Sequence, residues 1–220
     1  SETMLKTLRK VRTDEKYKAL VLRINSPGGS ALASDVMYRE LLLISEKMPV
    51  IVSMGDVAAS GGYFIACMPD TIVAQRNTIT GSIGVFGLIP NVQKLLNDKL
   101  GITVDGVKTG KFSDIGRIDR PLNKEESAII QNLTNRTYGD FKVKVAKHRN
   151  MDTASLDKIA QGRVWTGEDA LAIGLVDVLG GIDYALNIAI EKSGSKDYRI
   201  VELPEQRDPL ESLFNGSKDD

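Results

Sequence analysis

The sequence predicts an α/β fold in which helices pack on a largely parallel sheet. Apolar runs of strand length alternate along the chain with segments of helical periodicity. This alternation is typical of crossover units, in which a helix joins two parallel strands. Two glycine-rich turns, in RINSPGGS and DVAASGGY, each follow a strand-like run and precede a helix-like run. Crossover units should therefore begin near the N-terminus.

The expected elements follow in chain order. The chain opens in a helix-like segment, in which Leu5 and Leu8 lie among lysines and arginines, and this segment leads into a core strand. Strands are expected at 18–24, 49–54, 71–75, 83–87, 103–108 and 198–203. Helices are expected at 30–47, 58–68, 90–99, 124–148, 154–160, 167–173 and 181–192.

Two of these helices carry explicit start signals. Asn123 and Glu126 are spaced as a capping pair before the longest helix, and Thr166 and Asp169 repeat the pattern before the helix at 167–173. Gly174 is placed to end that second helix. These signals predict helix boundaries as well as helix content.

The chain length suits one domain, which we expect to span 1–204, with a polar tail at 205–220. No stretch approaches the roughly 20 apolar residues of a membrane span, so this portion is expected to be soluble. The start inside a helix, without a leader, suggests a piece of a longer protein. Any membrane anchor would then lie outside these residues.

The composition removes several classes of function. The chain has 29 basic residues (lysine and arginine) and 29 acidic residues (aspartate and glutamate). No overall electrostatic field therefore favours binding to nucleic acid or to an anionic membrane. Cys67 is the only cysteine, which excludes an internal disulfide and a cysteine-based metal cluster. Its apolar neighbours predict a buried filler. We expect neither a metal nor a cofactor.

Ser60 is the candidate nucleophile. It lies between Ala59 and the pair Gly61–Gly62, on the expected first turn of a helix, where small neighbours leave the hydroxyl unobstructed. A helix N-terminus beside it can stabilise a developing anion. The upstream pair Gly28–Gly29 leaves backbone N–H groups bare enough to bond an oxyanion.

A serine nucleophile needs a base. His148 is the only histidine, and it lies between Lys147 and Arg149 at the polar end of the longest expected helix. There it favours the helix dipole and solvent, so a Ser-His-Asp triad is not expected. A desolvated lysine is the remaining candidate, because burial lowers the pKa of a lysine toward neutrality.

Four ordered motifs resemble the signal peptide peptidase family, also called protease IV. They are RINSPGGS, GDVAASGGYFIA, TGSIGVFG and GRVWTGEDALAIGLVDVLGG, and the resemblance covers about residues 17–190. It implies a crotonase/Clp-protease-like fold, a spiral of repeated ββα units. It also implies a membrane-anchored bacterial serine protease that degrades the signal peptides left after secretion.

The resemblance assigns roles to four residues. Ser60 corresponds to the nucleophile, and Gly29 and Gly61 match positions whose N–H groups form the oxyanion hole. Ser82, in TGSIG, matches a serine that hydrogen-bonds the catalytic lysine. Without the resemblance, Ser82 reads as an ordinary turn hydroxyl.

The general-base lysine of the family is absent from its expected position. In VKTGKFSDIG the register places Ser113 where short family members carry the lysine, and Lys111 lies two positions away. Two residues of extended chain displace a side chain by about 7 Å, too far for proton transfer. Long family members contain two tandem copies, with the lysine in the N-terminal copy and the serine in the C-terminal copy. The chain therefore resembles the C-terminal repeat of the long form.

Three alternatives stay open. The chain could be a self-sufficient peptidase that uses Lys111, a crotonase-like acyl-CoA enzyme, or a non-catalytic assembly module. The preferred reading implies two protein partners, the N-terminal repeat of the same protein and further copies in a ring. It implies signal peptides or unfolded peptides as substrates. The full-length protein is then expected at the bacterial cell envelope, anchored in the inner membrane.

Overall fold

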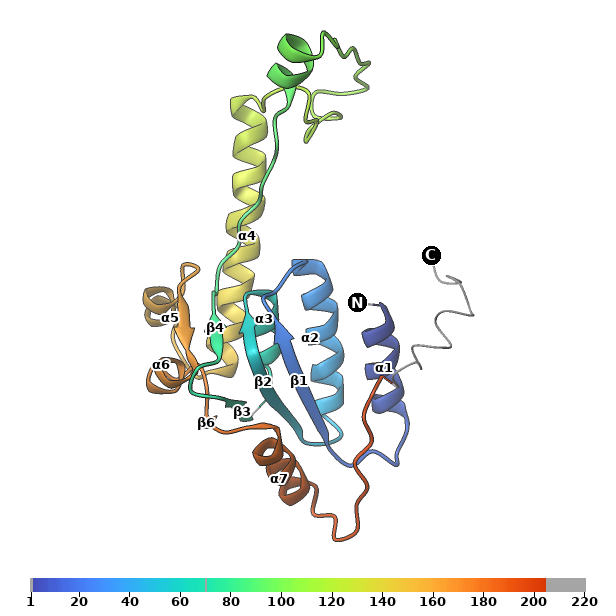
Figure 1. Ribbon diagram of the computed structural model, residues 1–220, viewed down its shortest axis with the longest axis vertical. Coiled ribbons are helices and arrows are strands. Elements are labelled where there is room, and N and C mark those ends of the chain that lie inside the picture. Colours follow the sequence, from blue (N-terminus) through green and yellow to red (C-terminus); the bar gives the residue numbers. More distant parts are fainter. Residues whose placement is uncertain (1, 70, 205–220) are drawn as a thin grey trace.

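The computed structural model describes residues 2–69 and 71–204. A six-stranded sheet lies at the centre of the body, with helices on both faces, and one long helix projects from it (Figure 1). The strands are β1 (Leu20–Ser26), β2 (Val50–Ala59), β3 (Thr71–Ala74), β4 (Ile79–Gly81), β5 (Val164–Thr166) and β6 (Val178–Leu179). The helices are α1 (Glu2–Thr13), α2 (Ala31–Ser45), α3 (Gly61–Ala66), α4 (Lys124–His148), α5 (Thr153–Ile159), α6 (Gly167–Ala172) and α7 (Ile182–Ser193).

Strand β2 organises the sheet. It pairs in parallel with β1 along one edge, while its other edge pairs first with β3 and then, near its end, with β4. β3 pairs in parallel with β6, and β4 pairs antiparallel with β5. Because β2 changes its pairing partner along one edge, the sheet curls. The C-terminal end of β2 pairs with β4. The expected α/β class with a mostly parallel sheet is confirmed.

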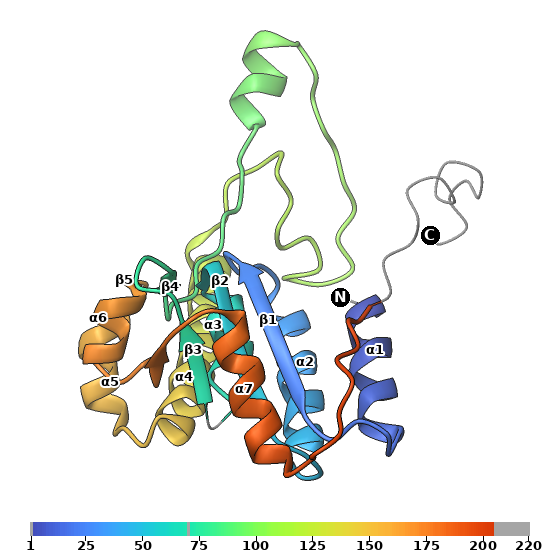
Figure 2. The same cartoon turned by 60° about the horizontal axis from the view of Figure 1, so that its bottom comes forward.

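The alternation of side chains along β2 divides the core between the two faces. Val52 and Met54 belong to the larger cluster, which also takes residues from α1 to α5. Ile51 faces the other way and packs with Ala185 and Ala189 of α7. Figure 2 shows α7 lying across that second face. The sheet is thus covered on both sides, as its apolar strands require.

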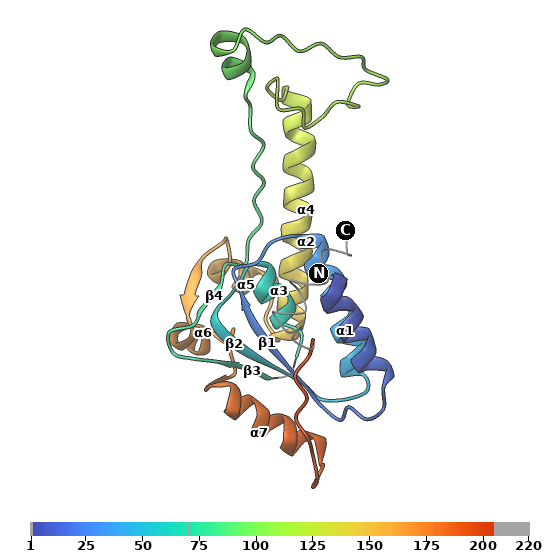
Figure 3. The same ribbon diagram turned by 45° about the vertical axis from the view of Figure 1, so that its right-hand side comes forward.

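A long excursion leaves the body and returns at the start of α4. Residues 87–123, here called the arm, run out beside α4, form a short π-helical turn at Leu95–Lys99, and fold back (Figures 1 and 3). α4 itself has 25 residues, which corresponds to a length of about 37 Å. Residues 97–113 of the arm are all exposed.

The helix start signals are confirmed. α4 begins with a full capping box, in which Asn123 accepts from the Glu126 N–H and Glu126 accepts from the Asn123 N–H. Thr166 caps α6 by accepting from the Asp169 N–H. Gly174, in a left-handed conformation with φ of 78°, follows the end of α6.

Three expected strands are wrong. Residues 83–87, 103–108 and 198–203 form no ladder, although their apolar content is that of strands. The segment 103–108 lies in the arm, where no neighbouring strand pairs with the backbone N–H and C=O groups of the segment.

The helix expected from 58 begins only at Gly61, because β2 continues to Ala59. Strands β4, β5 and β6 were missed because two or three residues carry no periodicity. The polar tail expected at 205–220 lies outside the described residues.

Candidate active site

Ser60 lies at the turn between β2 and α3 in an unusual backbone conformation. Its φ is 52° and its ψ is −119°, a region that residues with a side chain rarely adopt. The Ser60 N–H donates to the Gly81 carbonyl at 2.9 Å, and the Ser60 carbonyl accepts from the Phe64 N–H at 2.8 Å. The hydroxyl makes no capping hydrogen bond with α3. The backbone therefore holds the turn while the hydroxyl stays available.

The upstream glycine turn packs directly on the Ser60 turn. A Cβ built on Gly28 would lie 2.7 Å from the Gly61 nitrogen and 2.8 Å from the Ser60 Cβ. A Cβ built on Gly61 would lie 2.7 Å from Ser34 Oγ and 3.2 Å from the Gly29 nitrogen. Only glycine permits this approach. The structure thus brings Gly29, Ser60 and Gly61 together.

A cavity of about 910 Å³ opens beside Ser60. Its described lining contains no lysine, histidine, aspartate or glutamate, and Phe64 and Phe141 form an aromatic part of it, with ring centroids 4.9 Å apart. The lining residues are Pro27, Gly28, Gly29, Ala31, Ser34, Ser60, Gly61, Phe64, Ser82, Gly84, Val85, Phe86, Thr137, Tyr138, Phe141, Gln161 and Gly162. Such a cavity suits an uncharged, apolar peptide segment.

Ser82 lines the same cavity from the segment that follows β4. Its φ is 48°, again positive for a residue with a side chain, and its N–H donates to the Arg163 carbonyl at 2.7 Å. Two strained serines therefore face one cavity. Backbone strain of this kind is retained only where surrounding structure enforces it, and it clusters at functional sites.

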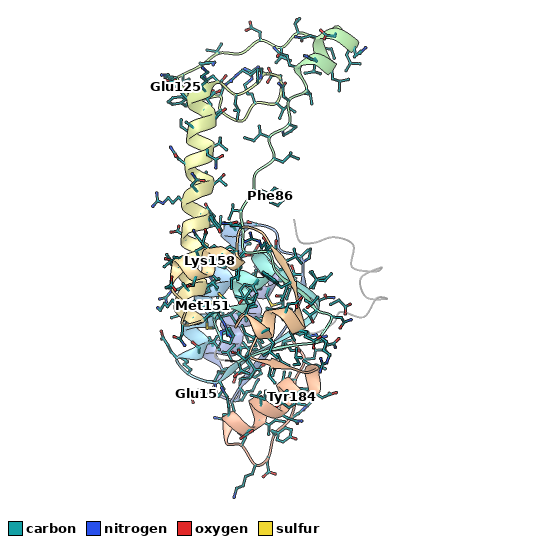
Figure 4. All side chains as sticks on the ribbon, turned by 90° about the vertical axis from the view of Figure 1, so that its left-hand side faces the viewer. Glu15, Phe86, Glu125, Met151, Lys158 and Tyr184 are labelled. Carbon is teal, nitrogen blue, oxygen red and sulfur yellow. The ribbon has the colours of Figure 1, made fainter. Side chains whose placement is uncertain are left out.

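The structure does not bring Lys111 or Ser113 to this cavity. Lys111 Nζ pairs with Glu125 at 2.7 Å, and the Ser113 hydroxyl donates to the Gly110 carbonyl at 3.0 Å. Figure 4 shows Glu125 at the end of α4 that projects from the body. The cavity-lining Tyr138 lies 13 positions after Glu125 along α4, a distance of about 20 Å along the axis.

His148 does not line the Ser60 cavity in the described chain. The expectation that it favours solvent at the helix end is incomplete. It is half-buried, and its Nε2 lies 2.7 Å from the Tyr38 hydroxyl. It borders a separate, shallower cavity of about 620 Å³ together with Arg149 and Asp177, which pair with each other.

Cys67 is fully buried, as expected. Burial raises the pKa of its thiol to about 12, so the group stays protonated and unreactive at neutral pH. Across the described residues, no cluster of three or more histidine, cysteine, aspartate or glutamate side chains is arranged to hold a metal ion. Nor does any helix of residues 2–69 and 71–204 have the length and apolar character needed to cross a bilayer.

Sequence reasoning missed the wall that α4 contributes. Thr137 and Tyr138 reach the cavity, together with Gln161 and Gly162 from the loop before β5. Gly162, with φ of 75°, was the available signal for a turn there. Nothing local to these residues predicts their approach to Ser60, because they join it only through the packing of α4 against the body.

A serine on a strained strand-to-helix turn, with backbone amides beside it, has the geometry of a nucleophile elbow. The first N–H of a helix has no intrahelical acceptor, so Gly61 can donate to a ligand. Arrangements of this class serve acyl transfer and hydrolysis through a covalent intermediate. The fold and the site together define the class as a serine hydrolase-like α/β domain.

Residues 43–196 match the model of peptidase family S49. The chain belongs to this family. Its fold class, a curled and mostly parallel sheet with covering helices, agrees with the crotonase/Clp-protease-like fold expected from the motifs.

Several curated proteins are similar over nearly the whole chain. The chain is 44% identical to "Protease 4" of Salmonella typhi over 98% of its own length and 35% of that protein. It is 41% identical to "Serine protease SPPA, chloroplastic" of Arabidopsis thaliana, covering 98% of this chain and 32% of the relative. A putative signal peptide peptidase of Enterococcus faecium is 34% identical and is covered over 63% of its length. The chain thus spans about a third of the first two relatives.

Proposed function

We propose that this chain is the nucleophile-bearing C-terminal repeat of a serine endopeptidase that degrades signal peptides left after secretion. The observation that carries the proposal is the cavity at Ser60, which offers a serine and two glycine amides but no lysine or histidine in its described lining. The general base then comes from the N-terminal repeat. The two relatives covered over only a third of their length support a longer natural protein.

In the proposed reaction the Ser60 hydroxyl attacks a peptide carbonyl while the incoming lysine accepts the hydroxyl proton. The Gly29 and Gly61 N–H groups hold the resulting oxyanion. Ser82 orients the lysine amine. The lysine returns the proton to the leaving amine, and water then hydrolyses the acyl-enzyme with the same base.

The cavity lining supports an apolar substrate. Its aromatic wall and the absence of charged side chains in the described lining leave nothing to compensate a buried charge on the substrate. An extended, apolar signal peptide meets this requirement. The relatives from Arabidopsis and Enterococcus, named as a serine protease and a putative signal peptide peptidase, support peptide hydrolysis.

We also propose that the N-terminal repeat and further copies of the protein cover the arm, in a homo-oligomer without nucleic acid. Leu88 and Val107 of the arm, and Phe86 directly before it, are each at least 87% exposed, and exposed apolar surface of this kind supports an interface there. We propose a bacterial cell envelope location with an inner-membrane anchor outside this chain. The Salmonella relative supports a bacterial protein, whereas the Arabidopsis relative is chloroplastic by name.

A fluorophosphonate probe tests the split site. We expect little labelling of Ser60 in the isolated chain and strong labelling once the N-terminal repeat is added, because base assistance commonly contributes 10²–10⁴-fold. Ser60→Ala is the negative control and should abolish labelling in the assembled protein.

The competing functions give different outcomes. Strong labelling and peptide cleavage by the isolated chain, both lost in Lys111→Ala, would establish the self-sufficient peptidase. Failure of both preparations to label would favour the assembly module. A Ser60-independent reaction with acyl-CoA would favour the crotonase-like enzyme.

A further inference from the structure

Two residues of the Ser60 cavity wall, Tyr138 and Gln161, belong to a compact polar cluster that extends behind the wall and that the proposed reaction does not use. Tyr138 of α4 donates its hydroxyl proton to Asp157 Oδ1 at 2.8 Å. The same carboxylate oxygen accepts from Lys142 Nζ at 2.7 Å, and Lys142 Nζ lies 4.4 Å from the centroid of the Tyr138 ring. The cluster joins α4 to α5 at the cavity.

The Tyr138 hydroxyl also acts as an acceptor. It receives the backbone N–H of Gln161 at 3.1 Å, and the Gln161 side-chain amide donates to the second oxygen of Asp157 at 3.2 Å. Gln161 has φ of 58°. Since a residue with a side chain adopts this conformation only where its surroundings enforce it, the two contacts define the path of the loop.

From this loop, backbone hydrogen bonds continue to the nucleophile. The Gly162 N–H donates to the Ile83 carbonyl at 2.9 Å, and the Ser82 N–H donates to the Arg163 carbonyl at 2.7 Å. One residue earlier, the Gly81 carbonyl accepts the Ser60 N–H at 2.9 Å. The path from Tyr138 through the loop to Ser82 and Ser60 therefore has no gap.

We infer that Tyr138 is a positioning residue, whose hydroxyl holds the loop at 161–163 and through it sets the placement of Ser82 and Ser60. This inference rests on the proposed function for its catalytic consequence, but the coupling itself is a property of the fold. The hydroxyl acts through hydrogen bonds and takes no part in proton transfer with substrate.

The protonation states of Tyr138 and Asp157 are those that the hydrogen bond between them requires. Burial, together with the hydrogen bond to Asp157, raises the pKa of the Tyr138 hydroxyl, so it remains a donor at neutral pH. The hydrogen bond from Lys142 lowers the pKa of Asp157 to about 2, so this carboxylate remains ionised and able to accept. Both roles of the tyrosine oxygen are therefore available throughout the neutral range.

Tyr138→Phe in the complete protein tests the inference. The variant keeps the aromatic ring in the cavity and removes only the hydroxyl. Tyr184→Phe is the matched control, because Tyr184 is exposed on α7 (Figure 4) and does not line the Ser60 cavity. We expect kcat for an apolar peptide to fall about 3- to 10-fold in Tyr138→Phe, the range for losing one hydrogen bond, with KM within about twofold.

Amide hydrogen exchange gives a readout independent of activity. Exchange should accelerate in peptides that cover residues 161–163 and 82–83 of Tyr138→Phe, and not in Tyr184→Phe. Unchanged exchange at those amides would overturn the inference, and so would an increase in KM at constant kcat, which indicates a wall that only contacts substrate. If the wild-type protein shows no Ser60-dependent cleavage while the exchange responds, the proposed function fails and the coupling stands.

Discussion

Ser60 combines a strained backbone with a hydroxyl that caps nothing. Its positive φ costs on the order of 1–3 kcal/mol, and the hydrogen bond to Gly81 together with the packing of Gly28 retains it. The free hydroxyl follows from the same geometry, because a serine in an ordinary N-cap conformation would bond an amide of α3. The available hydroxyl and the strained backbone therefore have one structural cause.

At the residue scale, we predict that Gly61→Ala removes most of the activity of the assembled protein. The added methyl group would lie 2.7 Å from Ser34 Oγ and 3.2 Å from the Gly29 nitrogen, so Ser34 must move and the Gly29 amide must shift by a few tenths of an ångström. Loss of one oxyanion donor typically lowers kcat by 10²–10³. Steady-state kinetics measures the change. Gly139→Ala, a helical position with open space, is the control and should retain activity. Equal activity of both variants would contradict the oxyanion assignment.

His148→Ala should leave the reaction intact but lower stability. Its Nε2 bonds the Tyr38 hydroxyl, which is buried, so the substitution removes a partner worth about 1 kcal/mol. We expect kcat/KM to change by less than tenfold, which is about 1.4 kcal/mol of transition-state energy. Thermal unfolding should show a lower midpoint, and Tyr38→Phe should match it. A larger kinetic loss in His148→Ala would mean that histidine serves as the base.

At the scale of elements, the start of α4 is anchored by a buried carboxylate. Glu126 is fully buried, accepts two hydrogen bonds from Arg120 at 2.6 and 2.8 Å, and completes the capping box with Asn123. Arg120 also bonds Asp114 of the arm at 3.1 Å. One guanidinium thus connects the helix start with the returning chain of the arm.

This anchor predicts a pH dependence. The hydrogen bonds from Arg120 lower the pKa of Glu126 from its usual 4.5 to about 2. A lowered folded-state pKa stabilises the fold above pH 4.5, and the contribution is lost as pH falls from 4.5 through 2. Thermal unfolding followed by circular dichroism should show this loss in the wild type. Glu126→Gln should start with a lower midpoint at pH 7 and decline less over the same interval. Parallel curves would show that Glu126 contributes nothing to the dependence.

At the scale of the whole molecule, the arm is an extended structure that reaches away from the body and carries exposed apolar side chains (Figures 1 and 3). Isolated chains do not gain stability from such a segment, because ordering it costs conformational entropy without burial in return. Burial against another chain would supply that gain, in line with the split site proposed above.

We therefore predict that the isolated chain self-associates, binds the N-terminal repeat, or does both, through the arm. Sedimentation velocity should show a concentration-dependent increase in mass, and Val107→Asp should reduce it because a charge replaces a side chain that is 97% exposed. Ile200→Asp is the control outside the arm, at a position 58% exposed. A monomer at all concentrations that gains no mass with the N-terminal repeat would refute the prediction.

The sequence alone determined the α/β class, the two glycine-rich turns, the bounds of α4 and the caps of α4 and α6, because these depend on local periodicity, capping and backbone freedom. It could not determine β4, β5 and β6, which are too short for a local pattern and exist only because neighbouring strands complete them. It also read residues 103–108 as a strand, although that segment finds no partner. Only the tertiary structure decided that Tyr138 and Gln161 line the same cavity as Ser60, while Lys111 lies at the far end of α4. Contacts between distant residues depend on how the elements pack.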